Sequence, residues 1–276
     1  MHSEFNWKTA DGLNIYAQAW SPDGAPRAVI ALAHGLGEHS GRYAHVGDFF
    51  AKAGIATVAY DRRGHGKSEG KRGHAPTYVH YYDEVAELVA QARTKFPNVP
   101  VFLYGHSMGG NIVLNYVLRN KITDLAGVIS TGALIQLAFK PSPLLIAAGK
   151  LTLKFWPSFT QKNQLDTTAL SRNPKVVSDY NNDPLVHNSL SSAAGIGMLD
   201  AADYLCNHAT TFPVPLYITH GGLDKVTSAP GSVWFANNYN GDITLRIWNE
   251  LYHEIHNEPE QAQVLGEILE WVNGKI

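Results

Sequence analysis

Short aliphatic runs alternate with helical patterns along the chain, and this alternation restricts the possible folds more than any other feature. The runs have the length and the β-branched content of strands that are buried on both faces. They lie at residues 28–33, 55–60, 101–104, 127–131 and 216–219, and a further strand is expected at 244–248. Between the second and third runs, apolar residues recur at helical spacing from Tyr78 to Ala92, ahead of Pro97. Strands that alternate with helices build right-handed βαβ units, so we predict an α/β fold with a mainly parallel central sheet and helices on both faces.

The stretch from Gly132 to Gly195 does not continue this alternation of strands and helices. Five prolines interrupt it, and it contains no convincing buried strand. A chain of 276 residues fits one α/β domain with a modest insertion. We therefore predict a core formed by residues 1–131 and 196–276, and an inserted helical cap at 132–195.

Composition narrows the class of protein. A formal net charge of −2 gives no electrostatic reason to expect a nucleic-acid partner, which would require clustered Lys and Arg. Cys206 is the only cysteine, so no intramolecular disulfide forms and a reducing compartment is the simplest setting. The N-terminal residues contain no apolar signal region, and no run of about 18 apolar residues occurs. We expect a cytoplasmic protein, or one that is peripheral to a membrane.

A Gly-x-Ser-x-Gly segment follows the apolar run at 101–104. Gly105 and Gly109 flank Ser107 at the spacing that lets a strand reverse tightly into a helix while the hydroxyl stays accessible. Ser107 would stand at the helix N-terminus, where the helix dipole favours developing negative charge. We identify Ser107 as the candidate nucleophile, and the alternative is a serine in an ordinary glycine-rich loop.

A serine nucleophile needs a base that accepts its proton, and an imidazole is suited to that role. In this strand–turn–helix architecture the base follows a late strand. His253 comes first after the expected strand at 244–248 and is favoured over His256, for which a surface or helix-capping role is the alternative. His220, at the end of an earlier strand, is interpreted as structural.

The base in turn needs a carboxylate that orients it, and this acid lies between nucleophile and base in the sequence. Asp224 follows the run at 216–219 in a glycine-rich turn and is the candidate acid, with an Asx-turn role as the alternative. Asp200 and Asp203 are weaker candidates because they lie in or near helical sequence.

Ester or amide cleavage through a serine also needs two aimed N–H donors for the oxyanion. The residue after the nucleophile supplies one donor, and the loop after an early strand supplies the other. Met108 and Leu36 hold these positions, and Gly35 and Gly37 allow the loop to turn its amides inward. We predict the backbone N–H groups of Leu36 and Met108 as the oxyanion hole.

A third glycine-rich segment, Asp61–Ser68, lacks the spacing of a phosphate-binding loop. We interpret it as a structural loop beside the site. Arg62, Arg63 and His65 are then expected in local polar contacts.

Four segments together resemble the monoacylglycerol lipase family. They are His34-Gly-Leu-Gly-Glu-His-Ser-Gly-Arg-Tyr43 and the segments at 61–68, 105–110 and 252–258. The first is the most specific, because generic esterases share the serine turn but seldom this continuation. The resemblance implies an α/β-hydrolase core with a mobile cap, no cofactor or metal, and hydrolysis of a monoacylglycerol to fatty acid and glycerol. It also supports Ser107, Asp224 and His253 as the catalytic triad.

The cap contains an expected helix that is apolar almost all round. Ser142 is a favourable N-cap residue and Pro143 suits the first helical position. From Leu125 to Leu165 the sequence has four lysines and no Asp or Glu. We predict that one apolar face lines an acyl tunnel while the other apolar groups and the lysines meet a lipid surface. The alternative is a helix that simply packs on the core.

Other activities fit parts of this pattern. A broad carboxylesterase or a lysophospholipase would use the same triad on a small lipid ester. A non-catalytic scaffold also exists on such folds, but an intact nucleophile, base, acid and oxyanion set argues against it. Dehalogenases and epoxide hydrolases use an aspartate nucleophile and are disfavoured by Ser107, whereas cofactor-free haloperoxidases retain the serine.

Overall fold

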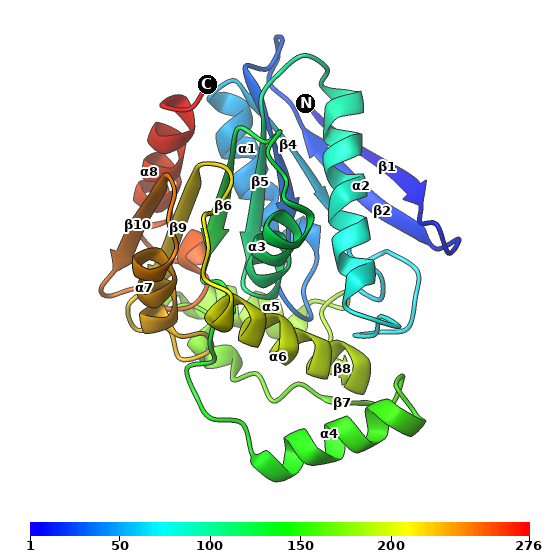
Figure 1. Ribbon diagram of the computed structural model, residues 1–276. Helices are drawn as coiled ribbons and strands as arrows, with labels where there is room; N and C mark the ends of the chain where they lie inside the picture. The colour runs from blue at the N-terminus through cyan, green and yellow to red at the C-terminus, as the bar shows by residue number, and fades with distance from the viewer.

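An eight-stranded sheet forms the centre of the computed structural model, which describes residues 1–276 (Figure 1). Its strands are β1 (His2–Lys8), β2 (Asn14–Trp20), β3 (Ala28–Ala33), β4 (Ile55–Tyr60), β5 (Val101–His106), β6 (Gly127–Thr131), β9 (Leu216–Gly221) and β10 (Ile243–Trp248). They are ordered β1-β2-β4-β3-β5-β6-β9-β10. The pairs β1–β2 and β2–β4 are antiparallel and all other neighbours are parallel. The mainly parallel sheet predicted from the sequence is confirmed.

Helices cover both faces of this sheet (Figure 1). They are α1 (Ala44–Lys52), α2 (Val79–Lys95), α3 (Met108–Asn120), α6 (Ser192–Asn207), α7 (Ala229–Asn238) and α8 (Gln261–Asn273). One hydrophobic cluster joins the sheet to α2, α3, α6 and α7, and a second joins its opposite face to α1 and α8. The short 3-10 turns are η1 (Ser40–Tyr43), η2 (Thr167–Ala169) and η3 (Ile255–Asn257).

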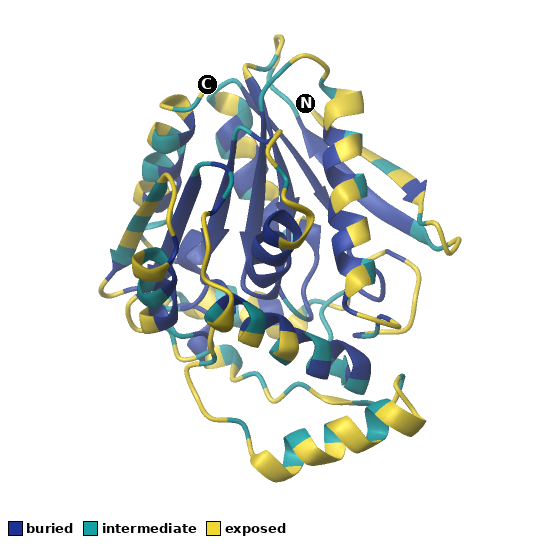
Figure 2. Ribbon diagram, in the orientation of Figure 1, coloured by how far each residue is buried: buried dark blue, intermediate teal, exposed yellow.

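The central strand β3 shows why these runs are continuously apolar. All of its residues are fully buried (Figure 2). Val29 and Ala31 point into one cluster, and Ile30 and Leu32 point into the other. Because both faces are covered by helices, no polar alternation is required along the strand.

Between β6 and β9 the chain leaves the sheet and forms the segment 132–195, which we name the cap segment. It contains α4 (Pro143–Phe155), β7 (Thr160–Lys162), α5 (Pro174–Asn182), β8 (Ser189–Ser191) and the first turn of α6. Strands β7 and β8 pair antiparallel, apart from the main sheet. These three-residue strands were not expected because they are too short to show a periodic pattern. Residue 195 lies inside α6, which borders α4 at its start and packs on α3.

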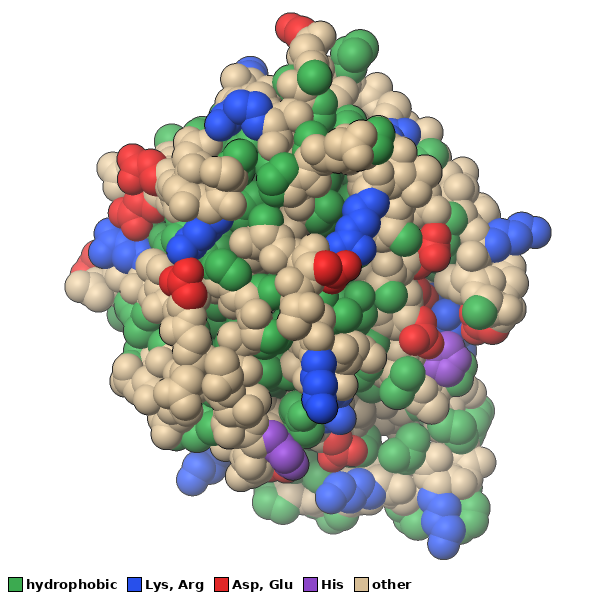
Figure 3. Space-filling model, turned by 45° about the horizontal axis from the view of Figure 1, so that its top comes forward, with side chains coloured by type: hydrophobic (Ala, Val, Ile, Leu, Met, Phe, Trp, Pro, Cys, Tyr) green, Lys and Arg blue, Asp and Glu red, His purple; other side chains and the backbone are tan.

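The helix α4 of the cap segment is exposed along most of its length (Figure 2). None of its residues is buried, and the side chains of Leu144 and Phe155 are 80% and 74% exposed. Pro143 holds the first helical position as expected, whereas the side chain of Ser142 makes no capping hydrogen bond. Figure 3 shows hydrophobic and basic side chains together along the lower edge of the molecule, where Figure 1 has the cap segment. No helix in the structure has both the length and the apolar character needed to span a bilayer.

Candidate active site

Ser107 lies at a sharp turn between β5 and α3. Its backbone has φ 56° and ψ −118°, a conformation that costs a non-glycine residue about 1–3 kcal/mol. A Cβ atom at Gly109 would overlap the carbonyl oxygens of Ala33 and His34. One at Gly105 would overlap the backbone of Gly109 in α3. Both glycines are therefore required for the strand to reverse into the helix at this point.

Three residues that are distant in the sequence form a chain of hydrogen bonds at this turn. The hydroxyl of Ser107 lies 2.9 Å from Nε2 of His253. Nδ1 of His253 lies 2.7 Å from Oδ2 of Asp224. Because a carboxylate only accepts, Nδ1 carries the proton and Nε2 is left to accept from the serine hydroxyl. The structure thus brings together the three residues that the sequence singled out.

Asp224, in the turn after β9, is held from several sides. Its Oδ2 accepts from His220 Nε2 at 3.0 Å and from the Thr227 hydroxyl at 2.8 Å. Its Oδ1 accepts from the backbone N–H groups of Val226 and Thr227. Burial raises the pKa of Asp224, but His253 and the other donors outweigh burial and hold the pKa below its usual value. The carboxylate therefore stays ionised while it faces the imidazole.

The contact between His220 and Asp224 goes beyond what the sequence indicated. His220 was interpreted as structural, and it does lie fully buried at the end of β9, where its Nδ1 contacts the Ser232 hydroxyl at 2.8 Å. Its position four residues before Asp224 was the one signal of a contact. The structure adds that His220 fixes the orientation of the carboxylate.

The charge of Asp224 also acts on His253. Burial lowers the pKa of the imidazole, but the adjacent carboxylate more than compensates, so the pKa of His253 lies above its usual value. His253 is consequently a stronger base than a free imidazole. This is the property that proton transfer from a serine hydroxyl requires.

Leu36 and Met108 both border the cavity beside Ser107. A Cβ atom added at Gly35 would lie 3.3 Å from the Cβ of Ser107, so the loop after β3 runs directly alongside the serine. Met108 is the first residue of α3, and the N–H groups of a first helical turn have no acceptor within the helix. The backbone segments that carry these two amides thus lie beside Ser107.

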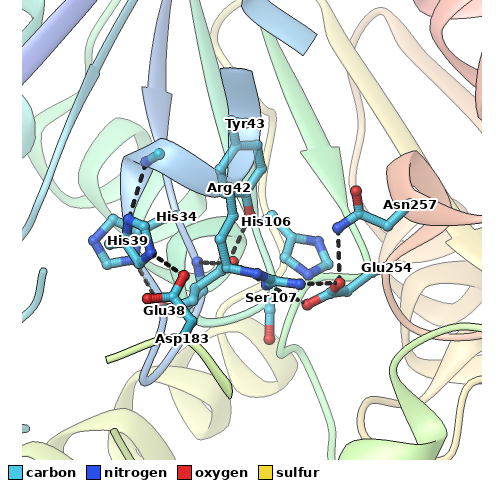
Figure 4. Close-up of polar contacts among 12 residues, drawn as sticks. His34, Glu38, His39, Arg42, Tyr43, His106, Ser107, Asp183, Glu254 and Asn257 are labelled. Atoms are coloured by element: carbon cyan, nitrogen blue, oxygen red, sulfur yellow. Dashed lines mark hydrogen bonds and ion pairs between the residues drawn. The ribbon is translucent and has the colours of Figure 1, made fainter. Parts of the chain in front are cut away.

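A buried ionic network joins the loop after β3 to the loop that carries His253 (Figure 4). The guanidinium of Arg42 contacts Glu38 Oε2 at 2.6 Å and both oxygens of Glu254 at 2.6 and 2.7 Å. Glu38 Oε1 accepts from the Tyr43 hydroxyl at 2.7 Å. Sequence reasoning assigned no role to these residues. The sequence did contain two signals of this network. They are the acidic and basic residues that alternate in the segment His34–Tyr43, and the acid that follows His253.

His256 does not have the surface or capping role that was its alternative interpretation. It is fully buried, and its ring stacks on Tyr43 with centroids 4.8 Å apart. Burial lowers its pKa to about 3, so the ring is neutral. It makes no hydrogen bond to Ser107 or Asp224, which leaves His253 as the imidazole in the relay.

A cavity of about 490 Å³ opens at Ser107 and extends under the cap segment. This volume lies within the range of about 300–1,000 Å³ that is usual for small-molecule sites. Its apolar lining includes Leu134, Leu137, Leu145, Ile146, Leu190 and Ile196. Because Leu145 and Ile146 belong to α4, one face of this helix borders the cavity while other side chains face outward.

Sheet order, the strained serine turn and the hydrogen-bonded Ser–His–Asp chain define a serine hydrolase of the α/β-hydrolase class. The family described as serine aminopeptidase, S33, matches residues 24–260. A monoacylglycerol lipase of Mycolicibacterium smegmatis is 35% identical over 98% of this chain and 96% of that protein. The chain belongs to this family of serine hydrolases and, as the motifs predicted, groups with its monoacylglycerol lipases.

Two further proteins are similar to this chain over nearly its whole length. The crystal structure of a Paleococcus ferrophilus monoacylglycerol lipase superimposes with a TM-score of 0.86, at 29% identity, over 95% of this chain and 99% of that chain. An abhydrolase domain-containing protein of Dictyostelium discoideum is 38% identical over 98% of this chain. The chain spans only 29% of the length of that longer relative.

Replacing Arg42 by Met should destabilise the fold by about 3–5 kcal/mol near neutral pH, because Glu38 and Glu254 would remain buried without their cation. Burial raises the pKa of Glu254, but Arg42 outweighs burial and lowers the pKa overall. The stabilisation is therefore complete above the unfolded pKa of about 4.3 and is lost as the pH falls below it. Urea denaturation at about pH 7 and pH 4 would measure the difference between wild type and variant, which should shrink at the lower pH.

The matched control is Lys175→Met, which removes an ion pair with Asp179 whose side chains are 78% and 64% exposed. Its effect should stay within about 0.5 kcal/mol. Equal effects of the two substitutions would contradict a structural role for the Arg42 network.

Proposed function

We propose that this protein hydrolyses monoacylglycerols to a fatty acid and glycerol, with Ser107 as nucleophile, His253 as general base and Asp224 as the orienting acid. The observation that carries this proposal is the hydrogen-bonded relay of these residues at the mouth of an apolar cavity of about 490 Å³. The names of the Mycolicibacterium and Paleococcus relatives support the same substrate class.

Acylation begins when Nε2 of His253 takes the proton of the Ser107 hydroxyl and the serine oxygen attacks the ester carbonyl carbon. The carbonyl oxygen becomes an oxyanion, which accepts hydrogen bonds from the backbone N–H groups of Leu36 and Met108. Asp224 stabilises the imidazolium that has formed. His253 then donates its proton to the departing glycerol oxygen, and the acyl group remains on Ser107.

Deacylation repeats these steps with water as the nucleophile. His253 accepts a proton from the water, the hydroxyl attacks the acyl carbon, and the same two N–H groups bind the second oxyanion. Collapse of this intermediate returns the proton to Ser107 and releases the fatty acid. No cofactor takes part in either half of the reaction.

The substrate class follows from the shape and lining of the cavity. Its apolar wall accommodates one acyl chain, and polar groups gather at the Ser107 end, including Glu38 and Glu254. We assign residues 132–195 as a cap over a core of residues 1–131 and 196–276. The cap supplies much of the wall and therefore determines which acyl chains fit.

Fatty-acid release from monoacylglycerols of graded chain length should depend on Ser107, and Ser107→Ala should reduce it on the order of 10⁶-fold. The assay would include matched diacylglycerols, triacylglycerols, lysophospholipids, short aryl esters and amino-acid anilides. Preference for monoacylglycerols is the expected result.

Faster turnover of short aryl esters would instead indicate a general carboxylesterase, and faster turnover of lysophospholipids a lysophospholipase. Cleavage of the anilides alone would indicate a peptidase. Absence of any Ser107-dependent turnover would contradict a hydrolytic function and favour a scaffold.

The pH profile of kcat/KM should have an acid limb set by His253. Attack requires the neutral imidazole, so activity is complete above the pKa of His253 and is lost as the pH falls through it. Since Asp224 raises this pKa, Asp224→Asn should move the acid limb to lower pH and reduce kcat on the order of 10⁴-fold. Initial rates from about pH 5 to pH 8 would measure both effects.

Asp203→Asn is the control for this measurement, because Asp203 is exposed on α6 and contacts only the neighbouring Asn207 side chain and helix. Its profile should match the wild type. An acid limb that stays in place or moves upward in Asp224→Asn would argue against the proposed role of Asp224.

We further infer that the outer face of α4 contacts a lipid surface. Leu151, Phe155 and Trp156 are 61%, 74% and 59% exposed on or beside this helix. Lys150 and Lys154 lie among them, and no acid occurs from residue 125 to 165. Exposed apolar groups with adjacent lysines favour an interface that contains anionic lipids.

A double variant, Leu151→Ser with Phe155→Ser, should reduce binding to anionic vesicles at least about tenfold, since each buried apolar side chain contributes about 1.5–3 kcal/mol. Vesicle flotation would measure binding, and turnover of a water-soluble short ester should not change. Leu223→Ser, at a residue of the core that is 47% exposed, is the matched control. Equal flotation of the wild type and the double variant would rule out this contact.

A further inference from the structure

Arg62 is a fully buried arginine that has no ion-pair partner. It follows β4, in the segment that the sequence suggested to be a structural loop. Its neighbour Arg63 is also buried but pairs with Glu84 and Asp11. A buried cation without a carboxylate is costly, so the groups that satisfy Arg62 need an explanation.

The guanidinium of Arg62 is satisfied by the backbone of the loop that runs beside Ser107. Nη1 donates to the carbonyl oxygen of His34, and Nη2 donates to that of Gly35 at 2.5 Å. Nη2 also lies 3.9 Å from the sulfur of Met108. Arg62 therefore contacts both segments that supply the proposed oxyanion donors.

The imidazole of His34 is a second donor to the same carbonyl. Its Nε2 accepts from the backbone N–H of Arg62 at 3.1 Å, so its Nδ1 carries the proton. That Nδ1 donates to the carbonyl oxygen of Gly35 at 2.8 Å. Two side chains thus hold one carbonyl oxygen from the interior of the protein.

The carbonyl of Gly35 and the N–H of Leu36 belong to a single peptide unit. The structure has no cis peptide bonds, so these two groups point in opposite directions. Fixing the carbonyl toward Arg62 fixes the N–H on the opposite side of the unit. Glycines flank Leu36 on both sides, and their backbone freedom would otherwise let this unit rotate. A rotated unit would present an oxygen where an oxyanion has to bind.

The positive charge of Arg62 also makes the N–H of Leu36 a stronger hydrogen-bond donor. A charge-assisted hydrogen bond to a carbonyl polarises the peptide unit, and bonds in such a chain reinforce one another. An oxyanion bound at the N–H of Leu36 would be the last acceptor in a series of hydrogen bonds that begins at the Arg62 guanidinium. No carboxylate forms an ion pair with Arg62, so the positive charge of Arg62 can act on the developing negative charge of the oxyanion.

We propose that Arg62, with His34, is a positioning residue that orients and polarises the Gly35–Leu36 peptide as an oxyanion donor. It acts through this peptide and does not contact the substrate. This role rests on the proposed function, because it assigns the oxyanion of the Ser107 reaction to Leu36. It also gives the segment at 61–68 a part in catalysis that its sequence pattern did not indicate.

The test compares an aryl ester with its thiono counterpart, in which sulfur replaces the carbonyl oxygen. Sulfur is a weak hydrogen-bond acceptor, so the thiono ester gains little from an oxyanion hole. Arg62→Met should lower kcat for the oxygen ester on the order of 10²–10³-fold, with little change in KM. The rate ratio of oxygen to thiono ester should fall by a similar factor, and Arg62→Lys should restore part of it.

Arg63→Met is the matched control, because it removes an equally buried guanidinium from the adjacent position. It should lower thermal stability and leave the rate ratio unchanged. A merely structural role for Arg62 predicts the same result for Arg62→Met, and that outcome would overturn the proposal. If Arg62→Met does not fold, His34→Ala removes the second donor to Gly35 and should lower the rate ratio.

The aryl ester pair keeps this test separate from the question of substrate. Absence of a preference for monoacylglycerols would count against the proposed function, whereas the rate ratio would still report on the oxyanion donor. An unchanged ratio in both Arg62→Met and His34→Ala, in an enzyme that prefers monoacylglycerols, would reject only the positioning role.

Discussion

The contact between the start of α3 and the end of β3 leaves no room for a side chain, and much of the site depends on it. Gly109 lies against the carbonyl oxygens of Ala33 and His34, and Gly105 lies against α3 itself. The strand therefore turns directly into the helix, and Ser107 takes up a strained backbone conformation. The same contact brings the loop after β3 alongside the serine. One steric restriction thus sets the position of the hydroxyl and of the loop beside it.

Buried polar groups then hold the loops around that turn in place. Arg42 joins Glu38 to Glu254, and four donors surround the Asp224 carboxylate in addition to His253. Such networks are stable only when their members are satisfied, because an unpaired buried charge is expensive. The other donors to Asp224 come from its own segment, residues 220–227, whereas Arg42 and His253 join segments that are far apart in the sequence. This explains why the four motifs are separated along the chain and adjacent in the fold.

Much of this arrangement could be predicted from the sequence. Buried parallel strands leave continuous apolar runs, and the Gly-x-Ser-x-Gly spacing around Ser107 marks a strand that reverses directly into a helix. The contacts of Arg42 with Glu254 and of Arg62 with His34 and Gly35 could not be predicted in this way, because they depend on which loops meet in three dimensions. His256 was misjudged for the same reason: the aromatic rings that bury it come from η1 and β5. Strands β7 and β8 carry too few residues for a periodic signal.

The cap segment is anchored unevenly. The backbone N–H of His187 donates to the carbonyl of Gly37, and that of Ser191 donates to the carbonyl of Gly73, so the end of the cap that contains β8 is attached to the core. The helix α4 packs mainly on α6 and has no buried residue. Its sequence is therefore nearly free of the constraints that fix the catalytic loops. Substitutions in α4 can therefore change which lipids bind during evolution, while the residues that cleave the ester bond stay the same.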